Sequence, residues 1–90
     1  MPQSLPSLIV IELAIARQLV RFRAGAGLSL AEMAKALGCS YQQVQKYERG
    51  QNRISAARLF QYAQACGVPV AEFYPPTVYT LSGVRQKDTL

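Results

Sequence analysis

The chain has 90 residues with ten Lys and Arg against five Asp and Glu, a formal net charge of +5, and no His. Half of its residues are hydrophobic, which excludes a disordered tail and fits one small globular domain. The longest apolar run, Leu8 to Ala16, is interrupted by Glu12 and is shorter than the roughly 20 residues that span a bilayer. No basic segment precedes this run as in a secretory signal, so we expect a cytoplasmic protein with Cys39 and Cys66 reduced.

Catalytic chemistry has few candidate residues in this sequence. With no His and five scattered carboxylates, no acid–base pair, nucleophile relay or metal cage can be assembled from the pattern. We therefore expect no enzyme activity, no cofactor and no metal site.

The first predicted helix runs from about Leu8 to Ala24, with Ser7 as its N-cap. Its first four residues, "LIVI", are β-branched enough that an initial strand is the alternative. The helix should end in the segment "AGAGLS". Because this segment follows a helix rather than a strand, it does not predict a nucleotide-binding loop.

A repeated capping pattern predicts the second and third helices. Each begins with a Ser that is followed three residues later by Glu or Gln, the spacing of a capping box: Ser29 with Glu32, and Ser40 with Gln43. The second helix should run to Leu37 and stop at Gly38. The third should end at Gly50, since Gly adopts the left-handed conformation that closes many helices.

The remaining elements follow the same pattern. Ser55 can cap a fourth helix that continues through Cys66, and Pro69 suits the first turn of a short fifth helix through Tyr74. The predicted fold is therefore all-α, a compact five-helix bundle at residues 1–74. Residues 75–90 are a polar tail that is disordered, a dimerisation arm or a strand that pairs with a partner.

The third predicted helix carries an unusual outer face. Residues 40–58 contain four cations against one anion, a local excess that favours a polyanionic partner. On a helical wheel Val44 and Glu48 fall on one side, and Gln42 and Lys46 fall on the other with Gln45 and Arg49. Amides pair with adenine and cations with guanine or phosphate, so this face suits a DNA major groove. The alternative is an ordinary solvated helix.

The spacing upstream favours DNA binding. Ala34, Gly38 and Val44 have the separations that two helices need to cross closely over a tight turn. Ala lets the backbones approach, Gly accepts the positive φ of the turn, and Val fills the angle between the helices.

With these motifs, "GLSLAEMAKALGCS", "QQVQKYERGQNRIS" and "LFQYAQACGVPVAEFY", the chain resembles the helix-turn-helix family of phage repressors, Cro proteins and xenobiotic-response-element-type bacterial regulators from Ile15 to Tyr74. The resemblance implies a lambda-repressor-like DNA-binding domain that acts as a homodimer on a palindromic operator, with the third helix as the recognition helix. It implies base contacts from Tyr41, Gln42, Gln45 and Lys46. It implies phosphate contacts from Ser29, Ser40, Gln43, Arg49, Gln51, Asn52 and Arg53, and from the capped amides of the second and fourth helices.

The resemblance also separates structural residues from functional ones. It suggests that Glu48 pairs with Arg23 at the end of the first helix, and we expect Tyr47 and Tyr62 to pack rather than to contact DNA. One departure is Leu30, which stands where many members of the family have a Gln that touches phosphate. That contact is expected to be missing here.

The apolar stretch from Leu8 to Leu13 exceeds what the first helix of such a domain needs. It either packs under the tail or forms a partner surface. Two alternative functions follow. One is an antitoxin-like protein that binds a protein partner through Leu8–Leu13 or the tail as well as its own promoter. The other is a helical adaptor with no DNA role.

Overall fold

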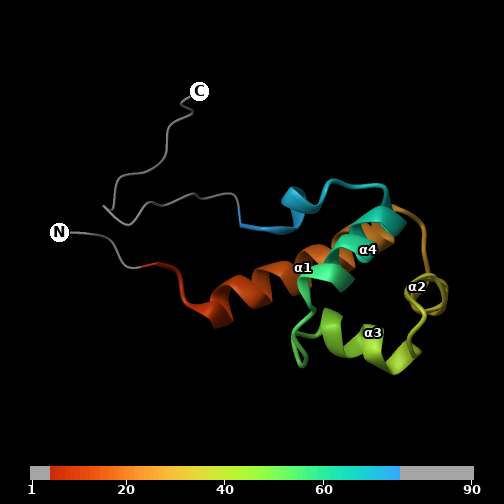
Figure 1. Cartoon of the computed structure of the whole chain (residues 1–90), viewed down its shortest axis with the longest axis horizontal. Helices are drawn as coiled ribbons and strands as arrows, with labels where there is room; N and C mark the ends of the chain where they lie inside the picture. The colour runs from red at the N-terminus through yellow and green to blue at the C-terminus, as the bar shows by residue number, and fades with distance from the viewer. Residues whose placement is uncertain (1–4, 76–90) are drawn as a thin grey trace.

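The computed structural model describes residues 5–75, and every regular element in that range is a helix. The four α-helices are α1 (Leu8–Gly25), α2 (Leu30–Leu37), α3 (Tyr41–Glu48) and α4 (Ala56–Cys66), and they are followed by a short 3₁₀ helix, η1 (Val70–Phe73). α4 lies alongside the long helix α1, and α2 and α3 form a pair at one end of the domain (Figure 1). The predicted all-α helix-turn-helix class is confirmed, while the predicted tail, residues 75–90, lies outside the described residues except for Pro75.

The prediction of five α-helices was wrong in its last element. The segment at Val70–Phe73 is a single 3₁₀ turn, in which the amides of Glu72 and Tyr74 donate to carbonyls three residues earlier. Tyr74 is extended, at φ −94° and ψ 156°, because the residue before a proline is disfavoured in the helical region. Between Pro69 and Pro75 the chain has no room for a longer helix.

The helix starts follow the Ser residues. α1 is helical from Leu8, so the alternative of an initial strand was wrong, and the Ser7 hydroxyl oxygen accepts from the Val10 amide at 3.2 Å. At α2 the capping box is complete, with Ser29 and Glu32 each accepting from the other's backbone. At α3 only half of it forms, since Ser40 accepts from the Gln43 amide at 3.0 Å without a return bond from the Gln43 side chain. A neutral amide is a weaker acceptor than a carboxylate at this positive end of a helix.

The core lies where α1, α4 and η1 meet the α2–α3 pair. Its largest fully buried side chains are Leu19, Met33, Val44, Tyr62 and Phe73. The ring of Phe73 packs edge-on to Tyr62, with ring centres 6.1 Å apart, and against Phe22 at 4.9 Å. The one-turn η1 therefore closes the core although it is too short to be an α-helix.

The turn between α2 and α3 has the geometry of a close helix crossing. Ala34 is buried, Gly38 has φ 70°, and Val44 is completely buried between the helices. The Cys39 amide donates to the Ala34 carbonyl at 3.1 Å, which closes the end of α2 before α3 begins. The α2–α3 pair is therefore held at a fixed angle by its own turn.

Within residues 5–75 no helix is long and apolar enough to cross a membrane, and no three His, Cys, Asp or Glu side chains gather as metal ligands.

Candidate nucleic-acid interface

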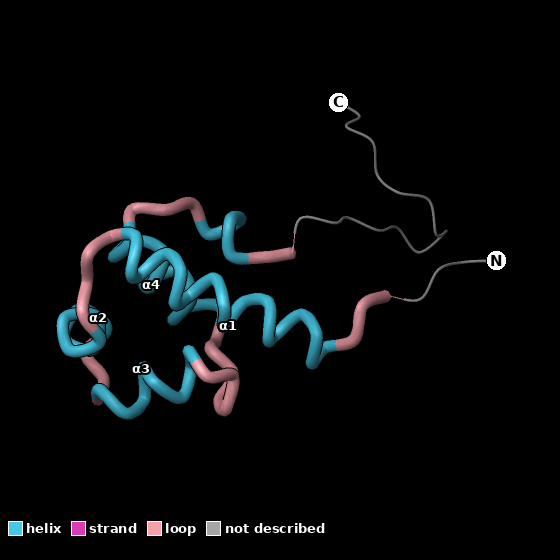
Figure 2. Tube along the Cα trace, turned by 180° about the vertical axis from the view of Figure 1, so that it is seen from behind, coloured by secondary structure: helices cyan, strands magenta, loops and turns pink. Residues whose placement is uncertain are grey.

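α3 places its amides and cations on the outside of the domain. Val44 is fully buried and the Glu48 side chain is almost buried against Arg23 of α1, whereas Gln42, Lys46 and Arg49 are exposed. The side of α3 that faces away from α1 is therefore polar and accessible along the whole helix. Figure 2, a view from behind, shows α3 at the edge of the domain.

Tyr41 and Gln45 are neighbours one turn apart on this outer side. The Gln45 Nε2 lies 3.4 Å from the Tyr41 hydroxyl oxygen, and Tyr41 as a residue is 44% exposed. The structure thus brings the four predicted base-contacting side chains, Tyr41, Gln42, Gln45 and Lys46, onto one helix, with the first and third in mutual contact.

The two Ser residues predicted near phosphates serve first as helix caps. The Ser29 oxygen accepts from the Glu32 amide at 3.0 Å, and the Ser29 amide donates to the Glu32 carboxylate at 2.8 Å. A carboxylate at the start of α2 repels an incoming anion. α3 has no acid in its first turn, so its positive N-terminal end at Ser40 is the more suitable of the two for a phosphate.

The loop after α3 has a fixed backbone. Gly50 has φ 71°, and the Lys46 carbonyl accepts from the amides of both Gln51 and Asn52, at 2.9 and 3.2 Å. The side chains of Gln51 and Asn52 are exposed beside the C-terminal end of α3. These two predicted phosphate contacts are therefore adjacent to the outer face of the helix.

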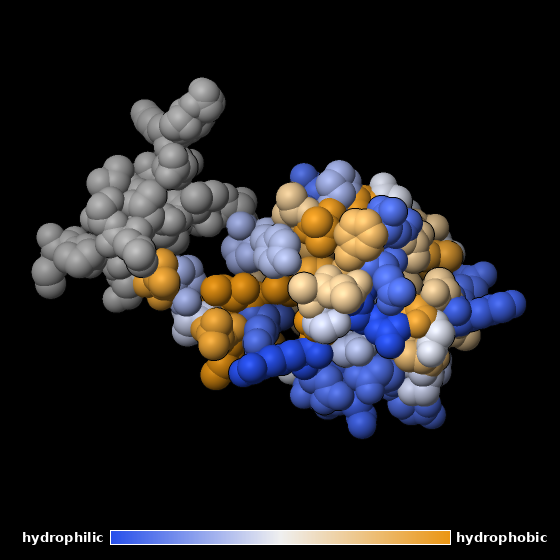
Figure 3. Space-filling view, viewed as in Figure 1, coloured by the Kyte–Doolittle hydropathy of each residue, from blue (hydrophilic) through white to orange (hydrophobic). Residues whose placement is uncertain are grey.

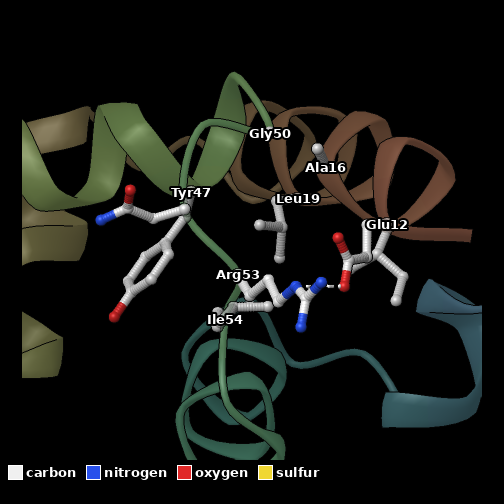
Figure 4. A pocket seen from close by; sticks show the side chains of 9 residues that line it. Glu12, Ala16, Leu19, Tyr47, Gly50, Arg53 and Ile54 are labelled. Carbon is white, nitrogen blue, oxygen red and sulfur yellow. Dashed lines mark ion pairs between the residues drawn. The ribbon is translucent and has the colours of Figure 1, made fainter. Parts of the chain in front are cut away.

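Arg53 makes an ion pair that the sequence analysis missed. Its Nε lies 2.8 Å from the Glu12 carboxylate on α1, and the Arg53 side chain is 75% exposed. Figure 4 shows the guanidinium pointing away from the loop toward Glu12, at a small pocket between α1 and the loop. An exposed pair of this kind contributes about 0–1 kcal/mol, so a phosphate can compete for the guanidinium.

A network of three side chains holds α3 against α1 and α4. Arg23 donates through Nε and Nη2 to the two carboxylate oxygens of Glu48, at 2.6 and 2.9 Å, and through Nη1 to the Leu28 carbonyl at 2.9 Å. The Arg23 and Glu48 side chains are 15% and 7% exposed. Charge-assisted, two-pronged bonds of this geometry are among the strongest hydrogen bonds in proteins.

The Tyr62 hydroxyl is the third member of this network. It lies 2.5 Å from Glu48 and 3.0 Å from the Leu19 carbonyl. Both neighbours are acceptors, so the single phenol proton goes to the closer, charged carboxylate. Burial, together with this hydrogen bond to Glu48, raises the pKa of Tyr62 far above its usual value, and the bond to Glu48 raises the pKa of Arg23. Arg23 and Tyr62 therefore keep the protons that they donate to Glu48.

Residues 19–73 match the family model described as Helix-turn-helix. The chain belongs to the helix-turn-helix family. This confirms the family predicted from the sequence.

Relatives of this helix-turn-helix chain include regulators of unknown target. An uncharacterised transcriptional regulator in the ATPase CF(0) region of Rhodospirillum rubrum is 55% identical over 42 residues, which cover 47% of this chain and 39% of the relative. The helix-turn-helix chain thus spans well under half the length of that relative.

Solved structures share the same arrangement. The clp gene regulator ClgR from Corynebacterium glutamicum is 31% identical with a TM-score of 0.67, over 76% of this chain and 86% of that one. The biofilm regulator SinR, solved in complex with DNA, has a TM-score of 0.61 over 66% of this chain and 95% of that one. At 23% identity SinR supports the helix-turn-helix fold alone.

The basic excess of this helix-turn-helix domain is partly structural. Arg58 was counted with the cations of residues 40–58, but its Nη1 donates to the Leu37 carbonyl at the C-terminal end of α2, and the residue is only partly exposed. Three cations remain exposed in this stretch, namely Lys46, Arg49 and Arg53. Arg58 is structural because a cation near a helix C-terminus can bind the carbonyls that the helix leaves unpaired.

Proposed function

We propose that this protein is a sequence-specific double-stranded DNA-binding transcriptional regulator, a repressor that binds a palindromic operator as a homodimer. The observation that carries the proposal is the orientation of α3, whose buried side is confined to Val44 and its neighbours while the amides and cations face outward. An α-helix with this outer face fits the major groove, where each base pair presents a distinct set of donors and acceptors. Transcriptional regulators among the relatives support the same function.

In this proposal the outer face of α3 recognises the bases, and residues at the ends of α3 and in the neighbouring segments bind the phosphate backbone of the DNA. Gln42 and Gln45 pair with base edges, Lys46 contacts guanine, and the Tyr41 ring meets a thymine methyl group. The phosphate contacts come from Ser29, Ser40, Gln43, Arg49, Gln51, Asn52 and Arg53. A regulator of this kind acts in the bacterial cytoplasm, where its operator is.

Selection of bound sites from a random duplex library, at near-physiological salt, tests the proposal. We expect an enriched inverted repeat with half-sites one helical turn, roughly 34 Å, apart. Gln42→Ala should relax the preference at one base position and cost about 1–3 kcal/mol on the selected site. An unchanged consensus for Gln42→Ala would contradict the assignment of base contacts, and no enrichment at all would contradict the function.

Phosphate contacts are tested by salt dependence. Arg53→Gln should weaken binding to all sequences alike and reduce the slope of log affinity against log salt by about 0.9, the contribution of one neutralised phosphate. Arg21→Gln is the matched control, because it removes one exposed cation from α1 instead of the loop beside α3. Equal slopes for the two variants would remove Arg53 from the interface.

An antitoxin-like role is the second candidate, and it rests on the exposed aliphatic side chains at the start of α1, where Leu8, Ile9 and Val10 are 60–70% exposed. It predicts a protein partner in addition to a promoter. Isolating a complex that forms through this surface while the selected DNA site is still bound would favour it over the simple regulator.

A further inference from the structure

The side of α1 that packs on the core continues beyond the core. Ala16 and Leu19 are buried, and one to two turns earlier Leu8, Ile9 and Leu13 extend the same apolar side, at 65%, 70% and 42% exposure. Figure 3 shows hydrophobic surface over this end of α1. We name Leu8, Ile9 and Leu13 the α1 apolar face.

This face carries no unpaired charge, although the chain as a whole is strongly basic. From Leu5 to Ala16 the only ionisable side chain is Glu12, and its carboxylate is bound to Arg53. The next cation, Arg17, lies one turn beyond Leu13. A polyanion has nothing to bind on such a face, whereas two molecules of charge +5 can meet here without placing like charges in contact.

The same end of α1 contacts the loop that follows α3. A Cβ at Gly50 would lie 2.9 Å from Leu13 Cδ2, so the loop backbone passes directly over this side chain. Glu12, which pairs with Arg53 of the same loop, is the residue before Leu13 on α1. Since α3 contacts α1 through its buried side, a molecule docked on the α1 apolar face leaves the outer side of α3 uncovered.

We propose that the α1 apolar face is the surface on which a second copy of this chain docks, α1 against α1. A two-fold interface repeats one patch on both partners, and an uncharged aliphatic patch is complementary to itself. Docking at this end brings the two loops after α3 close to the shared axis, because Gly50 and Arg53 of each loop contact this end of α1. The inference rests on the proposed dimeric regulator and supplies its dimer surface.

The first test is the mass of the full chain in solution, by sedimentation velocity over a range of concentrations. The parent should be a dimer, and Ile9→Lys should be a monomer, because the lysine places two cations against each other at the axis. Phe60→Lys is the matched control, since Phe60 is 55% exposed on α4, outside the α1 apolar face, and this variant should stay dimeric. Leu8→Lys repeats the test one residue away, and circular dichroism verifies that each variant is folded.

A monomeric parent overturns the inference, whether the face is then covered by the protein's own tail or by a different protein. The inference is also overturned if the Ile9→Lys and Leu8→Lys variants remain dimers. It is overturned again if Phe60→Lys is the variant that becomes a monomer.

A second measurement separates this inference from the proposed function. On the duplex selected from the random library, Ile9→Lys should lose about 100-fold in affinity, because linked half-sites gain at least this factor from effective concentration. On a duplex with a single half-site it should bind as the parent does. If the parent selects no sequence but Ile9→Lys still converts a dimer to a monomer, the DNA function fails and the dimer surface stands. If the parent selects a DNA sequence but Ile9→Lys has the same mass in solution as the parent, the dimer surface fails and the DNA function stands.

Discussion

Replacing Glu48 with Ala tests how α3 is held in place. The carboxylate accepts three hydrogen bonds, two from Arg23 and one from Tyr62, and these donors come from α1 and α4. Its loss leaves a guanidinium and a phenol without their partner in a site where the Arg23 side chain is 15% exposed. The whole domain is small, so the loss of this single group is a large perturbation.

Breaking a fully buried pair costs about 3–5 kcal/mol, and the partial exposure of Arg23 lowers our expectation to about 2–4 kcal/mol. In a domain of this size each kcal/mol lowers Tm by about 4–8 °C, so Glu48→Ala should melt about 10–30 °C below the parent. Affinity for the selected DNA site should fall because less protein is folded, while the preferred sequence stays the same.

Thermal unfolding followed by circular dichroism measures the effect. Glu72→Ala is the control, because it removes an exposed carboxylate from η1 and should leave Tm nearly unchanged. The double variant Arg23→Met with Glu48→Leu should recover part of the lost stability, since no charge is then left buried. The Tyr62 hydroxyl can still donate to the Leu19 carbonyl at 3.0 Å. A Tm for Glu48→Ala within about 2 °C of the parent would refute the reasoning.

Three further predictions concern the loop, its ion pair and alkaline pH. Gly50→Ala should lower stability more than Gly67→Ala, because both have φ near 70° but only at Gly50 would the new Cβ meet a carbon of α1, at 2.9 Å; equal losses of Tm would contradict this. Glu12→Gln should raise affinity for the selected site by up to about fivefold, the value of a surface ion pair, and should have no effect when Arg53 is already Gln; fluorescence anisotropy measures both. The phenol of Tyr62 keeps its proton in the folded state, while an unfolded Tyr ionises near pH 10, so this contribution to stability is complete below about pH 10 and is lost as the pH rises further. Melting curves from pH 8 to 11 should show that decline, and Tyr62→Phe should flatten it.

The positions of the helices follow closely from local chemistry. Ser29, Ser40 and Ser55 start α2, α3 and α4 as the sequence predicts, because the hydroxyl oxygen of each Ser accepts from the backbone amide three residues later. The same local reasoning failed at η1. There the two flanking prolines, rather than the apolar pattern, decide how many residues can be helical.

The contacts across the fold were less predictable. The family resemblance predicted the pair between Arg23 and Glu48. Tyr62 was expected only to pack, whereas its hydroxyl donates a hydrogen bond to Glu48. The Glu12–Arg53 pair joins residues 41 positions apart, and nothing in the local pattern of either residue indicates it. Such pairs depend on how α1 passes the loop, which is a property of the assembled domain. The assignment of base and phosphate contacts stays a prediction.

α3 has only eight residues. A free peptide shorter than about 12–15 residues is barely helical in water, so the sequence-reading element exists only while the rest of the domain is folded around it. A genetic screen for lost binding will therefore return two kinds of variant that differ in their signature. Substitutions in the core will reduce occupancy of every site in proportion and will be rescued by lower temperature or by second-site stabilisers. Substitutions on the outer side of α3 will redistribute occupancy among sites and will not be rescued in this way.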